Sequence, residues 1–135
     1  MLAVAAGTRG PGTEALASVP TTAPTFTSPT TFSNPFFPFV PGAVKVFSGR
    51  SEGTRTTDVD VFRVETRNFT LGAATVTCRT LDEYAFEDGA LVEISHNHFA
   101  QADDGTIYYF GETVDNYENG HVVDHHGSWL VGGPV

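Results

Sequence analysis

The chain has 135 residues, 16 acidic and seven basic side chains, and a formal net charge of -9. A chain of this length supports one domain, and its charge argues against binding to nucleic acids or anionic membrane surfaces, which both attract clustered Lys and Arg. The only cysteine, Cys78, excludes an internal disulfide framework, and its place in the alternating run ATVTC predicts a buried thiol.

Residues 1–33 are predicted to form a flexible arm or to contain the remnant of a signal peptide. They are rich in Thr, Pro, Ser, Ala and Gly, and such a composition buries too little apolar surface to offset its ordering entropy. The opening MLAVAAG is apolar and ends in small residues, as signal peptides do, which predicts a secreted or periplasmic protein. No stretch of the sequence approaches the roughly 20 apolar residues of a membrane span.

Phenylalanines at positions 32, 36, 37 and 39 form an aromatic segment that prolines at positions 35, 38 and 41 interrupt. The prolines exclude a helix and a central strand, because each lacks the backbone N–H that such an element needs. We expect this segment to lie extended across one end of the core and to cover it. An exposed aromatic strip that binds a partner is the alternative.

Residues 34–135 are predicted to form a single all-β domain. Apolar alternation indicates strands near 43–48, 58–66, 73–86, 90–101, 106–116 and 121–130. Asp88-Gly89 and Asn119-Gly120 are signals for hairpin turns, and no segment of useful length has helical periodicity. These features predict an antiparallel meander that curls into a small barrel or sandwich, with a cupin-like or jelly-roll form as one option.

The longest motif of the chain begins with NPFFPFVPG and continues as EDGALVEISHNHFAQADDGTIYYFGETVDNYENGHVVDHHGSWLVG. Over about residues 34–132 the sequence resembles a family of uncharacterised exported bacterial β proteins, whose pattern includes NPFFPL-PG and YFGEDV--Y-NGK-VSHEGSW. The resemblance implies an exported β domain and no established activity. His98 and His126 depart from the pattern, which has a bulky aromatic residue and Glu at these positions. Members commonly extend further, so the resemblance implies a short or truncated member with an uncovered sheet edge.

The five histidines lie between residues 96 and 126 and suggest a metal site. If both hairpins turn without irregularity, His96 and His98 share a strand face with His126, which lies two strands away across Gly111. Three neutral imidazoles with open positions suit Cu, Zn or Fe, so His96, His98 and His126 are the predicted metal ligands. The arrangement is similar to the His-x-His sites of cupins, although the cupin Glu is missing. Histidines on strands also act as packing residues, and a one-residue slip would exchange His126 for His125.

The opposite face is predicted to carry the main core, formed by Phe99, Tyr108, Phe110 and Trp129. Glu112 and His125 fall on this face as well. A carboxylate among apolar side chains needs a partner, and a His beside a carboxyl of raised pKa would make Glu112 and His125 a general acid–base pair.

Three functions follow from these patterns. The first is a secreted β domain that binds a transition metal ion through the histidine cluster. The second is a Cu- or Fe-dependent oxidase or oxygenase that acts on a carbohydrate or phenolic substrate. The third is a structural domain that forms a homodimer through an open sheet edge. A small-molecule or carbohydrate ligand is compatible with the acidic composition.

Overall fold

The computed structural model describes residues 2–4 and 23–133. All regular elements in these ranges are strands: β1 (Leu2–Val4), β2 (Val44–Ser51), β3 (Thr54–Leu71), β4 (Ala74–Glu87), β5 (Ala90–Gln101), β6 (Ile107–Glu118), β7 (His121–Asp124) and β8 (Trp129–Leu130). The predicted all-β class is confirmed, and the described ranges contain no helix long and apolar enough to cross a membrane. Most of the predicted arm or signal remnant, at residues 1 and 5–22, lies outside the described residues.

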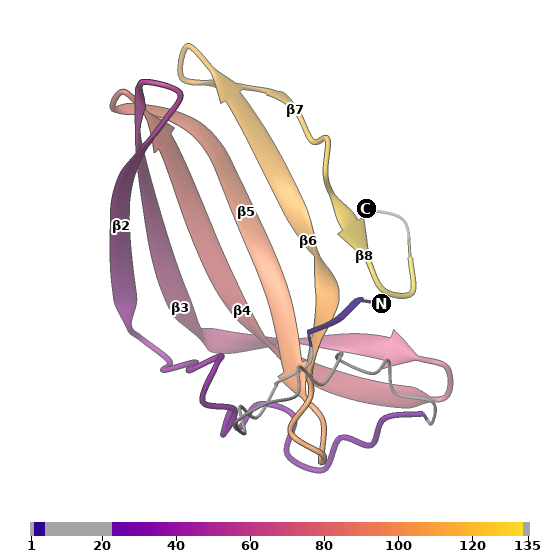
Figure 1. Cartoon of the computed structure of the whole chain (residues 1–135). Helices are drawn as coiled ribbons and strands as arrows, with labels where there is room; N and C mark the ends of the chain where they lie inside the picture. The colour runs from indigo at the N-terminus through magenta and orange to yellow at the C-terminus, as the bar shows by residue number, and fades with distance from the viewer. Residues whose placement is uncertain (1, 5–22, 134–135) are drawn as a thin grey trace.

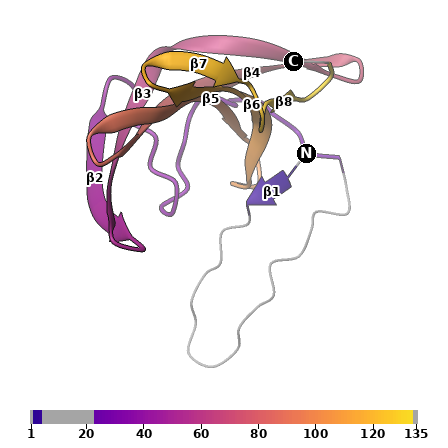
Figure 2. The same ribbon diagram turned by 90° about the horizontal axis from the view of Figure 1, so that it is seen from above.

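The strands form one antiparallel sheet in which consecutive strands from β2 to β6 are neighbours. The sheet order is β1-β6-β5-β4-β3-β2, and β7 and β8 also pair with β6. The sheet is strongly curved, with β2 along one edge and β1, β7 and β8 along the other (Figure 1 and Figure 2). This arrangement is the predicted antiparallel meander, because short turns join each strand to the next.

Two tight turns follow the expected sequence signals. Asp88 and Asn119 adopt positive φ angles of 47° and 51°, and the glycines that follow them have φ angles of 89° and 79°. Two successive residues with positive φ are typical of the type I′ turn, whose twist matches that of the flanking strands. The hairpins β4–β5 and β6–β7 therefore begin where the sequence predicts them.

Irregular pairing within the described strands determines which side chains share a face. Side chains alternate along a strand, so each extra residue moves the following side chains to the other face relative to the partner strand. The longest irregularity, on β3, coincides with the bend that turns the far ends of β3 and β4 sideways (Figure 1). The register shifts occur between Phe62 and Thr66, Ala85 and Phe86, His98 and Phe99, and Asn116 and Tyr117.

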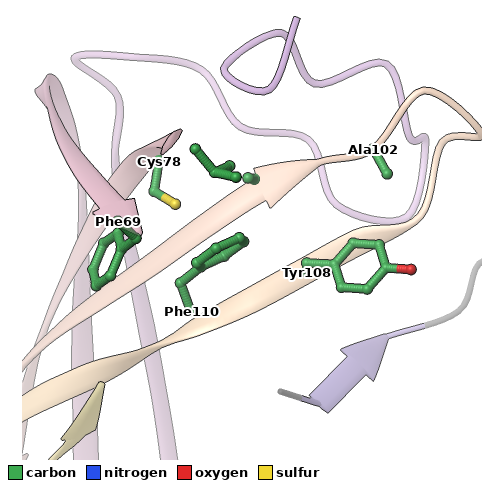
Figure 3. Packing of buried hydrophobic residues seen from close by; sticks show 7 residues of the cluster. Phe69, Cys78, Ala102, Tyr108 and Phe110 are labelled. Atoms are coloured by element: carbon green, nitrogen blue, oxygen red, sulfur yellow. The ribbon is translucent and has the colours of Figure 1, made fainter. Parts of the chain in front are cut away.

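One face, which we call the histidine face, carries His96 and His98 together with the larger apolar cluster. Figure 3 shows aromatic and small side chains from β3 to β6 meeting there. Tyr108 and Phe110 belong to this cluster, so their predicted position on the face opposite the histidines is wrong. The turn pairs Gln101 with Ile107 and Ala100 with Tyr108, which places Tyr108 on the face of Ala100 and the histidines. Phe110 is the extra residue at the pairing shift between His98 and Phe99. The buried members are Phe69, Val76, Cys78, Ala100, Ala102, Tyr108 and Phe110.

Cys78 lies inside this cluster and is fully buried. Removal of the thiol from water raises the pKa of Cys78 to about 12, because burial disfavours the thiolate. The thiolate is the reactive form, so Cys78 is a packing residue, as its alternating strand pattern predicts.

The aromatic segment, with Phe32, Phe36, Phe37 and Phe39, covers part of the sheet face opposite the histidine face. Phe39 packs edge-on against Phe62 with 4.9 Å between ring centroids, and Phe37 lies 4.8 Å from Phe99. These contacts agree with the expected extended segment that covers the core. Phe36 is the exception, because 67% of its surface remains exposed.

Residues 23–43, which we call the strap, bind the sheet at the turn between β5 and β6. The Thr27 backbone N–H and hydroxyl both donate to the Asp103 carboxylate at 2.8 Å. Phe26 packs against Tyr108 and Phe110 on the histidine face, so the strap contacts both faces. The boundary predicted at residue 33 therefore falls inside a packed segment, and residues 23–33 are not a free arm. Composition alone did not predict this packing, because it does not show that these polar residues form hydrogen bonds with the sheet.

Gln101 connects the strap to β5, and its replacement is expected to loosen the strap. Its side-chain oxygen accepts from the backbone N–H groups of Ser33 (2.8 Å) and Asn34 (3.1 Å), and its amide donates to the Ser33 hydroxyl. Gln101→Leu removes these bonds and leaves two N–H groups without their partner, so the free energy of unfolding should fall by about 1 to 2 kcal/mol.

Urea denaturation of wild type and Gln101→Leu measures this change, and limited proteolysis reports on the strap. The variant should be cut within residues 23–43 before the sheet unfolds. Equal stability and equal resistance to cleavage would contradict the assigned role of Gln101.

Candidate functional site

A polar pocket of about 290 Å³ opens on the histidine face, above the larger apolar cluster. Cross-strand pairing assembles its floor in two rows, because directly paired residues lie on the same face. Asp82 on β4 pairs with His96 on β5, which pairs with Thr113 on β6. Thr80 pairs with His98 in the next row. The lining residues are Arg63, Glu65, Arg67, Thr80, Asp82, His96, His98 and Thr113.

Asp82 is the central acid of the first row, and its side chain is only 4% exposed. One carboxylate oxygen, Oδ1, accepts from His96 Nδ1 at 2.7 Å, and the other, Oδ2, accepts from Arg63 Nη1 at 3.3 Å. A carboxylate can only accept, so Nδ1 of His96 carries a proton. In the neutral ring Nε2 is then unprotonated and is a hydrogen-bond acceptor.

His98 forms the second row and is 3% exposed. Its Nε2 lies 3.2 Å from Arg67 Nη1, and its Nδ1 lies 3.0 Å from the Thr80 hydroxyl. An Arg N–H can only donate, so Nε2 accepts and Nδ1–H donates to Thr80. Burial, followed by the positive charge of Arg67, lowers the pKa of His98 to about 4. His98 is therefore neutral at physiological pH.

The two arginines of the pocket differ in whether a carboxylate neutralises their positive charge. Arg63 pairs with the carboxylates of Asp82 and Glu65, at 3.3 and 3.2 Å. Arg67 is held by the neutral ring of His98 and lies over the Phe69 ring, 5.1 Å from its centroid. Within the described residues no carboxylate lies at ion-pair distance from Arg67. These two contacts orient Arg67, which is exposed and whose positive charge has no carboxylate partner among the described residues.

The structure brings two of the three predicted metal ligands together and separates the third. His96 and His98 line the pocket, whereas His126 lies in the loop after β7 with a 92% exposed side chain beside Asp124. Extra residues lengthen the chain segment from β7 to β8 relative to β6. They lie at the pairing shift between Asn116 and Tyr117 and in the loop before β8, so Gly111 pairs with Leu130. No group of three or more metal-ligating side chains is present in residues 2–4 and 23–133.

Metal binding by this chain stays a prediction. A metal ion at His98 Nε2 would have to displace the Arg67 guanidinium, which competes for the same lone pair. Elemental analysis of the purified protein, beside His96→Ala and His98→Ala variants, tests whether Cu, Zn or Fe is bound.

Glu112 and His125, the predicted acid–base pair, have separate partners. His125 Nδ1 lies 3.0 Å from the Val114 carbonyl oxygen and 2.8 Å from Asp115 Oδ1. Glu112 lies on the face opposite the histidines, near Tyr109, whose hydroxyl donates to Asn97 Oδ1. Burial, followed by the negative charge of Glu112, raises the pKa of that phenol. The structure therefore does not pair Glu112 with His125.

Sequence reasoning missed six residues of the pocket: Arg63, Glu65, Arg67, Thr80, Asp82 and Thr113. Arg63 lies within the β3 irregularity and Arg67 follows it, and Thr80 and Asp82 lie on β4. The only sequence signal for them was an unusual run of charged and polar residues at alternating positions in otherwise apolar strands. That pattern is also typical of a solvated sheet face.

The fold and the site together define an antiparallel β domain with a polar pocket built on a sheet face. No protein-family model, no curated protein and no solved structure matches the chain. The resemblances to exported bacterial β proteins and to cupin metal sites stay predictions. The function has to be inferred from the pocket.

Proposed function

We propose that this protein binds a small molecule that carries a carboxylate, with Arg67 as the anion anchor of the pocket. The observation that carries the proposal is the hydrogen bond from Arg67 to the neutral ring of His98. A carboxylate partner would neutralise the guanidinium, whereas an imidazole holds it and leaves its charge unchanged. An arginine that is oriented but uncompensated suits bidentate recognition of an oxyanion.

The charges around the pocket favour a carboxylate over a phosphate. Two arginines face two carboxylates, Asp82 and Glu65, and both carboxylates bind Arg63. The pocket therefore offers one uncompensated positive charge. A singly charged carboxylate matches it, whereas a dianionic phosphate would bring a second negative charge close to Glu65.

This proposal differs from metal binding in the state of His98. Carboxylate binding keeps the Arg67–His98 hydrogen bond, whereas metal binding at His98 breaks it. The volume of the pocket, about 290 Å³, is close to the lower limit for small-molecule binding sites. Its lining restricts the ligand to a compact polar molecule.

Carboxylate binding is testable with two probes of the same shape. Titration of the 15N-labelled chain with cyclohexanecarboxylate should shift the backbone amide signals of residues 63–67, 80–82 and 96–98. Cyclohexanecarboxamide, which lacks the charge, should bind about tenfold more weakly, because a charge-assisted hydrogen bond contributes about 1.5 kcal/mol or more. Equal affinity for both probes, or shifts confined to residues outside the pocket, would contradict the proposal.

A further inference from the structure

We propose that the ligand of this pocket is a hydroxy-carboxylate of monosaccharide size, a sugar acid, whose hydroxyl group donates to Nε2 of His96. This inference rests on the proposed carboxylate site and specifies its ligand class. It follows from the hydrogen-bonding groups that the pocket offers beside Arg67.

His96 supplies a fixed acceptor. Its Nδ1–H is committed to Asp82 Oδ1 at 2.7 Å, which leaves Nε2 without a protein partner among residues 23–133. Asp82 is itself buried and holds Arg63 with its other oxygen, so the acid fixes the His96 tautomer and takes no ligand hydrogen bond. The side chain of His96 is 42% exposed, so a ligand in the pocket can reach it.

A bare anion does not satisfy such a pocket. The Nε2 lone pair of His96 and the carboxylate of Glu65 both face a ligand as acceptors, and two acceptors repel an oxyanion that lacks hydrogens. The Thr113 hydroxyl, in the same row as His96, can donate or accept. A molecule that has hydroxyl donors beside its carboxylate fits these groups and Arg67 at the same time.

The size of the site limits the hydroxy-carboxylate to a small one. A volume of about 290 Å³ is enough for one sugar ring. Every residue of the pocket lining has a polar or charged side chain, which agrees with a ligand that carries polar groups around its ring.

Three ring compounds separate the contributions of charge and hydroxyl groups. Glucuronate has both, cyclohexanecarboxylate has only the carboxylate, and glucose has only the hydroxyl groups. For the wild-type chain, calorimetry or NMR titration should give a glucuronate affinity about tenfold above that of cyclohexanecarboxylate, since one neutral hydrogen bond contributes about 1 to 1.5 kcal/mol. Glucose should bind more weakly than both.

His96→Leu tests the assigned acceptor directly. The variant should lose the preference for glucuronate and keep its affinity for cyclohexanecarboxylate, because Arg67 is unchanged. His126→Leu is the matched control, since His126 lies outside the pocket with a 92% exposed side chain, and it should bind as wild type does. Thermal unfolding of each variant shows whether it is folded, and the wild-type comparison of ligands stands independently of any variant.

The outcomes distinguish this inference from the proposed function. Equal wild-type affinity for glucuronate and cyclohexanecarboxylate overturns the hydroxyl contact and leaves the carboxylate site. If glucose binds as tightly as glucuronate, both the carboxylate site and the hydroxyl contact are overturned. Both are also overturned if neither glucuronate nor cyclohexanecarboxylate binds. A preference for glucuronate that survives in His96→Leu places the hydroxyl contact on another residue and overturns the role of His96.

Discussion

Replacing Arg67 with glutamine is expected to weaken carboxylate binding by about 10- to 100-fold. The guanidinium is the one cation of the pocket without a carboxylate partner among the described residues. A hydrogen bond to a charged group contributes about 1.5 to 3 kcal/mol, and that range corresponds to the stated loss of affinity. Titration with cyclohexanecarboxylate at constant salt measures it.

Two further variants show whether charge or geometry is responsible. Arg67→Lys keeps the charge but loses the planar fork, so it should recover only part of the affinity. Arg55→Gln removes a positive charge from the same strand outside the pocket, and it should bind nearly as wild type does because solvent screens distant charges. A loss in Arg55→Gln as large as that in Arg67→Gln would mean that net charge alone governs binding.

The fold was predictable because its signals are local. Asp88-Gly89 and Asn119-Gly120 specify their own turns through positive φ angles. The alternation of apolar and polar residues in each strand needs no knowledge of the partner strand. A meander then follows, because short turns place consecutive strands side by side.

The site was only partly predictable because pairing irregularities decide which residues meet. If the β4–β5 hairpin continued the register of Phe86 and Leu91, Asp82 would pair with Ser95 on the other face. The shift between Ala85 and Phe86 instead pairs Asp82 with His96. No residue in this stretch marks the extra position, since neither glycine nor proline occurs there.

The same effect removed His126 from the predicted metal site. A regular hairpin at Asn119-Gly120 would pair Thr113 with His126, whereas the structure pairs Glu112 with Trp129 and leaves the histidine in a loop. Gly111 is the sequence feature that could have indicated this irregular pairing. Its φ angle is 109°, and a Cβ there would lie 2.2 Å from the Trp129 carbonyl oxygen. Glycine in a strand is typical of a bulge or of a close approach by another backbone.

The stability of the protein is expected to fall as the pH decreases from about 6.5 to about 4, and His98 is the cause. Its pKa in the folded protein is about 4, mainly because of burial and then because of the Arg67 charge, whereas an unperturbed histidine titrates near 6.5. In this pH range the unfolded chain binds a proton that the folded protein does not. Acid therefore favours unfolding, and His98 accounts for a loss of at most about 3 kcal/mol by pH 4.

Urea denaturation at pH 7, 5.5 and 4 tests this linkage when wild type is compared with His98→Gln. Burial raises the pKa of the Glu83 and Glu93 carboxyls, and these two groups act in the opposite direction to His98. They destabilise the folded protein as the pH rises through their raised pKa values, because burial disfavours the charged carboxylates. Both contributions remain in the variant, so the difference between the two curves isolates His98. A constant difference across the three pH values would contradict the assigned protonation state.

Arg67→Gln links the pH effect to the binding site. Removing the positive charge beside His98 takes away the second cause of its lowered pKa, so the ring should accept a proton at higher pH than in wild type. The stability difference between pH 7 and pH 4 should therefore be smaller in Arg67→Gln than in wild type. If the pH dependence is the same in wild type and Arg67→Gln, then the guanidinium does not act on His98, and the contact proposed to orient the anion anchor is absent in solution.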